Sequence, residues 1–354
     1  MGAAGDVRGT REDDGGRRPG SVAAGAVYGR LHYGLTLSRV LVTGGGGFAG
    51  LHLLRELTRN RREGVAATTL EARPEAGSEA AKLTDVEWFS MDVASTDSVV
   101  EVVRQVRPEI VYHLAGQASV GASFGSPLPT WEVNATGTLR LLTVLADESS
   151  RTQRVLLASS AEVYGVVPDG SQPIQEETPY RPATPYGASK AAAEVAALQA
   201  SRASGIEVVI ARAFNHIGPG QDERFVLPSM ARQLVDILSR QSRPVLRVGN
   251  LDVERDFLDV RDVVLGYIAL MTAGQVGEAY NVCSGRSHSL EDVVVRLVSL
   301  SGTGAEIEVD PDRVRPADIP RLTGDPGRLR DLGWEQRIEL DETLRDLLDE
   351  VGSE

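Results

Sequence analysis

The chain has 354 residues, 42% of them hydrophobic, and a formal net charge of −13, which suits a large soluble α/β core. This acidity argues against a general nucleic-acid binder or a binder of anionic membranes. One cysteine excludes an internal disulfide framework, and no apolar run approaches the roughly 18 residues of a membrane span, so we expect a cytoplasmic protein. We expect no metal site.

Residues 1–37 are rich in Gly, Arg and Asp and show no sustained periodicity, so we expect a disordered N-terminal tail. Arg17-Arg18, followed by small residues, is similar to a twin-arginine export signal. The segment Ser21–Tyr28 is too short and too weakly apolar for the hydrophobic region of such a signal. We therefore do not expect export.

The first ordered element is predicted to be a buried strand at Val40–Val42, followed by a glycine-rich turn and a helix to about Asn60. The turn carries a G-x-x-G-x-x-G pattern. Glycines there permit a tight turn and close approach of a pyrophosphate, which the helix N-terminus attracts. A glycine run alone is more often a flexible loop, but the flanking strand and helix favour a dinucleotide site. The candidate contacts are Gly44, Gly47, Phe48, Ala49 and Gly50.

The next strand is predicted at Val65–Leu70 and leads to Glu71, about 20 residues after the last glycine of the pattern. A carboxylate at this position suits the ribose diol of NAD and disfavours a 2′-phosphate. Arg73 offers the alternative, a contact with the phosphate of NADP. We therefore expect NAD or NADP, with NAD favoured by Glu71.

Two further strands are predicted at Glu87–Met91 and Ile110–Leu114. Asp92 after the first of them is interpreted either as a partner of the adenine amine or as the cap of the following helix. The second strand leads into small residues that let a cofactor lie against backbone. The cofactor-binding candidates at these strand ends are Asp92, Val93, Leu114, Ala115 and Gly116.

A long helix is predicted at Leu128–Asp147, and it contains Asn134. An asparagine inside a helix is often solvated or bridges backbone groups. A fifth strand at Val155–Ala158 leads to Ser160. Because catalytic residues tend to lie at the carboxyl ends of parallel strands, we expect Ser160 to bond a substrate oxygen.

The helix Pro185–Ser204 carries Tyr186 and Lys190 four residues apart, so both project from one face. An ammonium beside a phenol stabilises the phenolate, so we expect a lowered pKa for Tyr186 and a role as general acid or base. The chain has only one other lysine, Lys82, which suggests a need for a compact ammonium here. The alternative is a buried tyrosine with an incidental lysine.

The pattern changes near Phe214, where regular alternation of strands and helices gives way to loops and short elements. We divide the chain into a mainly NAD(P)-binding domain at 38–213 and a mainly substrate-binding lobe at 214–354, some of whose segments return to the first domain. Amphipathic helices are predicted at 263–271, 290–300 and 340–348. Arginines on loops suit a diphosphate clamp, although most such residues are solvated surface charges. They are Arg224, Arg232, Arg247, Arg255, Arg261, Arg313, Arg315 and Arg321.

Taken together, these residues resemble the extended short-chain dehydrogenase/reductase family, over about residues 39–350. The resemblance is carried by the glycine turn, His113-Leu114-Ala115-Gly116, Val133-Asn134, Thr136-Gly137-Thr138, Ser160, and Tyr186 with Lys190. It implies a Rossmann doubly wound parallel sheet with a smaller carboxyl-terminal lobe, NAD(P), and a nucleotide-activated sugar. It also implies that Tyr186 donates a proton, Lys190 bonds the nicotinamide ribose, and Ser160 orients a ketone. By the same resemblance, Asn134 fixes the helix geometry and a water near Lys190. Family members of this kind form homodimers, here through the helices near 128–147 and 186–203.

The second half is most similar to the branch of the family that reduces GDP-6-deoxy-4-keto-D-mannose. The carrying stretches are 213–221, 248–257, 280–285 and 315–320. By this resemblance the diphosphate is held by Asn215, Arg255 and Arg315. Asp318 bonds the nucleotide sugar, and Ser119 and Ser160 face the hexose. Cys283 is interpreted as a small core residue.

The implied reaction is reduction of a C4 ketone by NAD(P)H, giving GDP-D-rhamnose or its C4 epimer. Glucose-type 4,6-dehydratases carry an Asp-Glu pair where this chain has Ala161-Glu162. Mannose-type dehydratases retain only the glutamate, so Glu162 leaves a catalytic role in a GDP-mannose 4,6-dehydratase open. An epimerase, which would carry cysteine at that position, and a non-catalytic NAD(P) sensor are further alternatives.

Overall fold

The computed structural model describes residues 2, 39–59, 64–71, 78–147, 150–240, 243–313 and 319–353. Apart from Gly2, the predicted N-terminal tail lies outside the described residues, as do Arg73, Arg315 and Asp318. In the described part of the chain, no helix combines the length and apolarity needed to cross a membrane.

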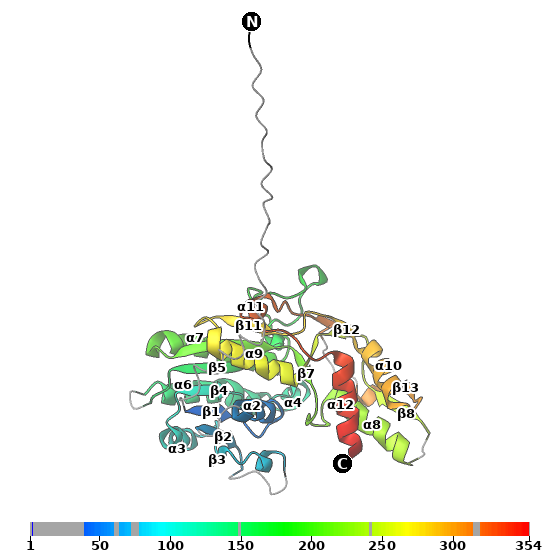
Figure 1. The fold of residues 1–354 in the computed structure, drawn as a ribbon, viewed down its shortest axis with the longest axis horizontal. Helices are drawn as coiled ribbons and strands as arrows, with labels where there is room; N and C mark the ends of the chain where they lie inside the picture. The colour runs from blue at the N-terminus through cyan, green and yellow to red at the C-terminus, as the bar shows by residue number, and fades with distance from the viewer. Residues whose placement is uncertain are drawn as a thin grey trace.

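A central sheet of seven parallel strands organises the first lobe, in the order β11-β6-β5-β4-β1-β2-β3 (Figure 1). Most of its strands are rich in buried apolar residues, because both faces of the sheet are covered, whereas the edge strand β3 is largely half-buried or exposed. The reversal of strand order beside β1 is typical of the Rossmann arrangement, so the predicted fold class is confirmed. The strands are β1 (Val40–Thr43), β2 (Val65–Thr69), β3 (Val86–Ser90), β4 (Ile110–His113), β5 (Arg154–Ser160), β6 (Glu207–Ala213) and β11 (Ala279–Val282).

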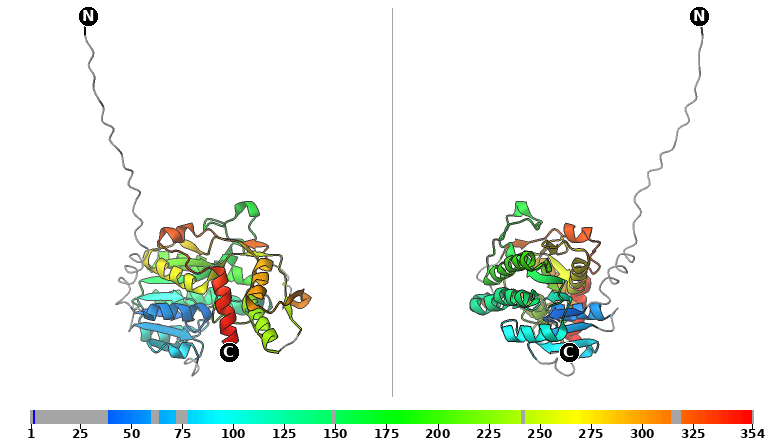
Figure 2. Two further views of the ribbon diagram at one scale, coloured as in Figure 1. Left: turned by 45° about the vertical axis from the view of Figure 1, so that its right-hand side comes forward. Right: turned by 90° about the vertical axis from the view of Figure 1, so that its left-hand side faces the viewer.

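Helices cover both faces of this sheet, as the two views in Figure 2 show. One face packs against α2 (Phe48–Arg59) and α9 (Val260–Ala273), which contact each other. The other face packs against α3 (Thr96–Val106), α6 (Gly137–Leu145) and α7 (Pro185–Ser204). Two apolar clusters, one on each side of the sheet, therefore form the core of this lobe.

Helix α7 has clear boundaries in the sequence. The Thr184 hydroxyl accepts a hydrogen bond from the backbone N–H of Gly187 (3.0 Å), and Pro185 occupies the first helical position. Gly205 ends the helix with a φ of +79°. These signals fix where Tyr186 and Lys190 lie in the first turns.

The second lobe packs around a separate apolar cluster, to the right in Figure 1. Helices α8 (Val226–Arg240), α10 (Leu290–Ser301) and α12 (Leu340–Ser353) contact one another there.

The remaining α-helices of the two lobes are α4 (Val120–Gly125), α5 (Pro127–Trp131) and α11 (Gly327–Asp331). The remaining strands are β7 (Asn215–Ile217), β8 (Val245–Val248), β9 (Glu254–Arg255), β10 (Phe257–Asp259), β12 (His288–Ser289), β13 (Glu306–Val309) and β14 (Arg321–Leu322).

The parallel register places this lobe next to the carboxyl end of the sheet. Ser160 at the end of β5 pairs with Ala213 at the end of β6. Asn215, two residues further on, begins β7, which pairs with β10 of the second lobe. Cys283, just after β11, is fully buried in the cluster that contains Phe214, which confirms its interpretation as a core residue.

Candidate active site

The turn after β1 presents backbone, not side chains, at the carboxyl end of the sheet. Gly44 has a φ of +69°, and a Cβ at this position would lie 2.7 Å from the backbone nitrogen of Ala115. A Cβ at Gly50 would overlap the carbonyl oxygens of Gly44 and Gly45. Helix α2 begins at Phe48, directly behind this turn. The site therefore fits a pyrophosphate held by backbone groups at a helix N-terminus.

A second backbone segment, after β4, lies between this turn and helix α7, which carries Tyr186 and Lys190. The backbone N–H of Ala115 donates to the Thr43 hydroxyl (3.2 Å). A Cβ at Gly116 would lie 2.9 Å from Asn134 Oδ1 and 3.4 Å from Lys190 Nζ. Gly116 therefore allows both side chains to lie close to the backbone after β4.

The candidates at the ends of β2 and β3 lie further along the sheet. Glu71 and Asp92 are both exposed. Ser95, not Asp92, caps helix α3, so the capping interpretation of Asp92 is wrong; its carboxylate accepts the backbone N–H two residues on (2.8 Å). Val93 is buried and packs against Gly137, so its side chain contributes to the packing at this end of the sheet.

Ser160, Tyr186 and Lys190 come together at the end of β5. The Ser160 hydroxyl hydrogen-bonds the Tyr186 phenol. The Lys190 ammonium donates to the carbonyl oxygen of Ala158 (2.9 Å) and lies 5.9 Å from the centroid of the Tyr186 ring. All three side chains are at least nine-tenths buried. The structure thus assembles the three residues that the sequence suggested.

The acidity of Tyr186 differs from the sequence-based expectation. Burial raises its pKa to about 12, the hydrogen bond from Ser160 opposes this rise, and the charge of Glu162 adds to it. Burial also lowers the pKa of Lys190 to about 8, against the charge of Glu194, which raises it. The expectation of a lowered Tyr186 pKa is therefore wrong, because desolvation raises this pKa and Lys190 is not among the groups that act on it. Tyr186 is a neutral phenol at neutral pH and has a proton to donate.

Asn134 lies in a π-helical turn (η2, Glu132–Thr136), which divides the helix predicted at 128–147 into α5 and α6. Its Oδ1 accepts from the backbone N–H of Gln117 (2.8 Å). Its Nδ2 donates to the Gln117 carbonyl oxygen (3.1 Å) and to the Ser189 hydroxyl (3.0 Å). Asn134 therefore bridges backbone groups and fixes the segment after β4 to the helix that carries Tyr186 and Lys190.

His113, part of the motif His113-Leu114-Ala115-Gly116, is linked to Asn134 through Thr138. Thr138 donates its one proton to the Asn134 carbonyl oxygen (2.6 Å), so His113 Nε2 donates to Thr138 Oγ1 (3.0 Å). His113 Nδ1 then accepts from the Thr43 hydroxyl (2.8 Å). Burial, with the charge of Lys190, lowers the His113 pKa to about 3, so the ring is neutral and has one tautomer.

Glu162 and Ser119 make different local contacts. The Glu162 carboxylate accepts a hydrogen bond from the Thr184 hydroxyl (3.3 Å), and its charge acts on Tyr186. Ser119 caps helix α4, and its hydroxyl accepts from the backbone N–H of Ala122 (3.2 Å). Ala161, beside Glu162, is buried in an apolar cluster, so this position carries a methyl group and no second carboxylate.

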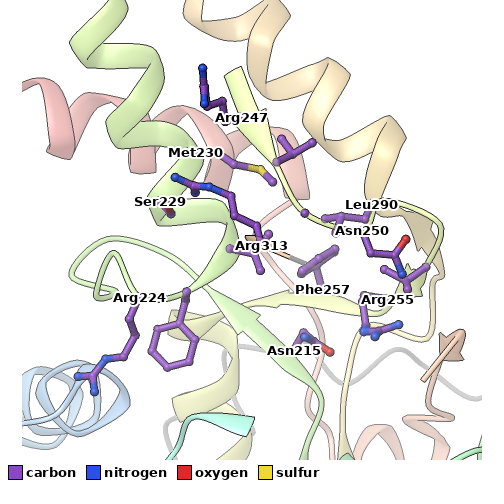
Figure 3. Close-up of a pocket in the computed structure, with 15 residues that line it drawn as sticks. Asn215, Arg224, Ser229, Met230, Arg247, Asn250, Arg255, Phe257, Leu290 and Arg313 are labelled. Carbon is purple, nitrogen blue, oxygen red and sulfur yellow. The ribbon is translucent and has the colours of Figure 1, made fainter. Parts of the chain in front are cut away.

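A pocket of about 330 Å³ opens in the second lobe, beyond Asn215 (Figure 3). In that view Asn215 lies beside Arg255, while Arg224 lies on the opposite side of the opening. The pocket is lined by Asn215, Arg224, Phe225, Val226, Ser229, Met230, Arg247, Val248, Gly249, Asn250, Val253, Arg255, Phe257, Leu290 and Arg313. Four guanidinium groups and apolar walls suit an anionic ligand that carries an aromatic base.

The structure separates these pocket arginines from the other arginines of the second lobe. Arg232, Arg261 and Arg321 do not line the pocket; they pair with Glu223, with Asp259 and Asp346, and with Glu254. Two pocket arginines, Arg224 and Arg313, also have acidic partners, so the distinction is which arginines line the pocket. Sequence reasoning did not distinguish the two groups, because the distinction depends on which loops meet across the lobe.

Comparisons with known proteins agree with this geometry. The family model described as GDP-mannose 4,6 dehydratase matches residues 41–347. The GDP-6-deoxy-D-mannose reductase of Pseudomonas aeruginosa is 38% identical over 311 residues, which are 88% of this chain and 96% of that protein. GDP-mannose 4,6 dehydratase 2 of Arabidopsis thaliana is 31% identical over 266 residues, 73% of this chain and 70% of that protein. The solved structure of RMD from Pseudomonas aeruginosa complexed with NADPH superposes with a TM-score of 0.76 at 35% identity, covering 89% of this chain and 99% of that one.

Proposed function

The chain belongs to the GDP-mannose 4,6 dehydratase family of extended short-chain dehydrogenases/reductases, and from that premise we propose that it reduces the C4 ketone of a GDP-linked 4-keto-6-deoxyhexose. The observation that carries the proposal is the Ser160–Tyr186–Lys190 group at the end of β5, next to the arginine-lined pocket that begins at Asn215. GDP-6-deoxy-4-keto-D-mannose is the proposed substrate, with GDP-D-rhamnose or its C4 epimer as product.

NAD(P)H, when bound, supplies the hydride that adds to the ketone carbon. Tyr186, a neutral phenol, donates its proton to the oxygen of the developing alkoxide, and Ser160 hydrogen-bonds the same oxygen. Lys190 keeps a positive charge beside the tyrosinate that forms, and it bonds the nicotinamide ribose. Asn215 and Arg255 hold the diphosphate, together with Arg315, and Asp318 bonds the nucleotide sugar; Arg315 and Asp318 lie outside the described residues.

The surroundings of Glu162 disfavour a glucose-type dehydratase. A glucose-type dehydratase needs a second acid before this glutamate, and the buried methyl group of Ala161 occupies that position. Glu162 itself lies near Tyr186, so a mannose-type dehydratase is the second candidate function.

The cofactor is a nicotinamide dinucleotide held by the glycine turn. The carboxylate of Glu71, exposed after β2, suits the ribose diol of NAD. The related structure from Pseudomonas aeruginosa is complexed with NADPH. We favour NAD from Glu71 and propose that the reaction takes place in the cytoplasm, where the free thiol of Cys283 stays reduced.

Replacing the proton donor is the first test. Tyr186→Phe should lower kcat for reduction of GDP-6-deoxy-4-keto-D-mannose by about 10²–10⁴-fold, because the ring remains and the proton is lost. Fluorescence titration with NADH and NADPH should show nearly unchanged cofactor affinity. Undiminished reduction by the variant would remove Tyr186 from the mechanism.

An assay of the wild-type enzyme separates the two candidate functions, reductase and mannose-type dehydratase. Wild-type enzyme incubated with GDP-mannose and oxidised cofactor should form no 4-keto sugar detectable by NMR. Formation of that ketone, without reduction of the added keto sugar, would assign the chain to the dehydratases.

The pH dependence follows from Lys190. Its charged form persists below its pKa of about 8, whereas Tyr186 stays protonated to about 12. We therefore expect kcat/KM for ketone reduction to be level near neutral pH and to fall as pH rises through about 8. Rates measured from about pH 6 to 10 test this, and a profile level to pH 10 would show that Lys190 is not the titrating group.

A further prediction concerns the affinity of the arginine-lined pocket for GDP. Arg255→Met should weaken GDP binding by about 10–100-fold, as expected for loss of a charge-assisted hydrogen bond. Arg243→Met is the matched control, because Arg243 is exposed and pairs with Glu306 outside the pocket. Calorimetry should show normal GDP affinity for the control, and equal affinities of the two variants would place the diphosphate elsewhere.

We also propose a homodimer through the outer face of α5, α6 and α7, where Leu128, Leu139 and Val195 are 81%, 43% and 57% exposed. Light scattering at micromolar concentration should give twice the chain mass of 37.9 kDa. Val195→Glu should shift the protein towards monomer, whereas Leu238→Glu on α8 should not. A monomeric wild type would contradict the proposal.

A further inference from the structure

A buried ion pair lies directly behind the catalytic residues. Glu194 on α7 is 0% exposed and Arg212 on β6 is 4% exposed. The Arg212 Nε donates to both carboxylate oxygens (3.1 Å each), and its Nη2 donates to Oε2 (2.8 Å). Both charges are thus desolvated and matched by a multidentate contact.

Three residues from strand β5 and from the loop before α7 form hydrogen bonds with this pair. Ser159, adjacent to Ser160 on β5, donates to Glu194 Oε1. The Tyr180 hydroxyl donates to Glu194 Oε2 (2.7 Å) and accepts from Arg212 (2.9 Å). Arg212 also donates to the Glu176 carbonyl oxygen (2.8 Å), in the loop that leads to Tyr186. One carboxylate therefore joins β5, β6, α7 and the loop before it.

The same carboxylate is placed to act on Lys190. Glu194 follows Lys190 by one helical turn, on the same face of α7. Lys190 is buried, and among the described residues no carboxylate forms a direct ion pair with it. The other groups near Lys190 are the neutral imidazole of His113, the neutral phenol of Tyr186 and the Ala158 carbonyl oxygen.

We propose that Glu194 is a positioning residue for the reaction: held by Arg212, its carboxylate keeps Lys190 charged and fixes α7 on β5 in the register that brings Tyr186 to Ser160. A buried ion pair is a poor source of stability, since apolar residues of similar size often serve as well. The presence of a charged Glu194 at this buried position is explained by Lys190, the cation one helical turn away. The kinetic consequence rests on the proposed function, whereas the ionisation of Lys190 does not.

The chain allows a direct test because Lys82 and Lys190 are its only lysines. Biosynthetic labelling with [ε-¹³C]lysine gives two side-chain resonances, and their pH dependence reports each ionisation by NMR. In wild-type protein Lys190 should be charged at pH 7 and should titrate well before Lys82. A neutral Lys190 at pH 7 would overturn the proposal without any variant.

Glu194→Gln should move the Lys190 titration to lower pH, with about a tenfold higher ratio of neutral to charged amine at a given pH. Because Arg212 is then left unpaired, the double variant Glu194→Leu/Arg212→Met provides a folded alternative without buried charge and should show the same displacement. Glu79→Gln is the matched control: Glu79 pairs with Lys82, so only the Lys82 resonance should respond. An unchanged Lys190 titration in either folded Glu194 variant would refute the inference.

Kinetics then separate this inference from the proposed function. In the Glu194 variants the alkaline fall of kcat/KM should move to lower pH together with the Lys190 resonance, and KM for the nucleotide sugar should stay unchanged. A wild type that reduces no keto sugar would contradict the proposed function alone. Wild-type reduction with an unshifted profile in the variants would contradict the role of Glu194 alone.

Discussion

The seating of helix α7 on strand β5 is the constraint on which the candidate active site depends. Lys190 reaches the carbonyl oxygen of Ala158, and Glu194 is bonded by Ser159, so two successive turns of the helix are tied to successive residues of the strand. Gly187 makes this approach possible, since a Cβ there would lie 2.5 Å from the Glu162 carbonyl oxygen. The positions of Ser160 and Tyr186 follow from these contacts.

Burial, more than charge proximity, sets the chemistry of the tyrosine. A desolvated phenol resists ionisation, so Tyr186 keeps its proton until a substrate oxygen takes it. The same burial disfavours the charge on Lys190. The carboxylate of Glu194, one turn away, opposes this effect and favours the charged amine. The neutral His113 adds no competing charge beneath them. The site therefore stores one proton and one cation in an apolar setting, as ketone reduction to an alcohol requires.

Local patterns predicted the glycine turn, the boundaries of α7 and the clustering of Ser160 with Tyr186, because each depends on short spacing or on parallel strand order. Other features depend on contacts between distant segments and leave no local signal. The π-helical turn contains Asn134, whose side chain bonds the backbone of the distant Gln117, and the partner of Glu194 lies 18 residues away on strand β6. The raised pKa of Tyr186 depends on burial, which Y-x-x-x-K spacing does not encode. Among the scattered arginines, only the tertiary fold distinguishes pocket residues such as Arg247 from arginines that lie outside the pocket.

The sheet edge and the arginine pocket adjoin because β6 continues through Phe214 into Asn215, so a nucleotide sugar anchored by its diphosphate can present its hexose to Ser160. The most direct test traces the hydrogen itself. The enzyme is supplied with GDP-6-deoxy-4-keto-D-mannose and reduced cofactor that carries two deuterons at C4 of the nicotinamide, and the product is analysed by NMR. We predict one deuteron on C4 of the hexose and a solvent proton on the new hydroxyl. A product without deuterium at C4, or an unreacted ketone, would contradict hydride transfer to that carbon.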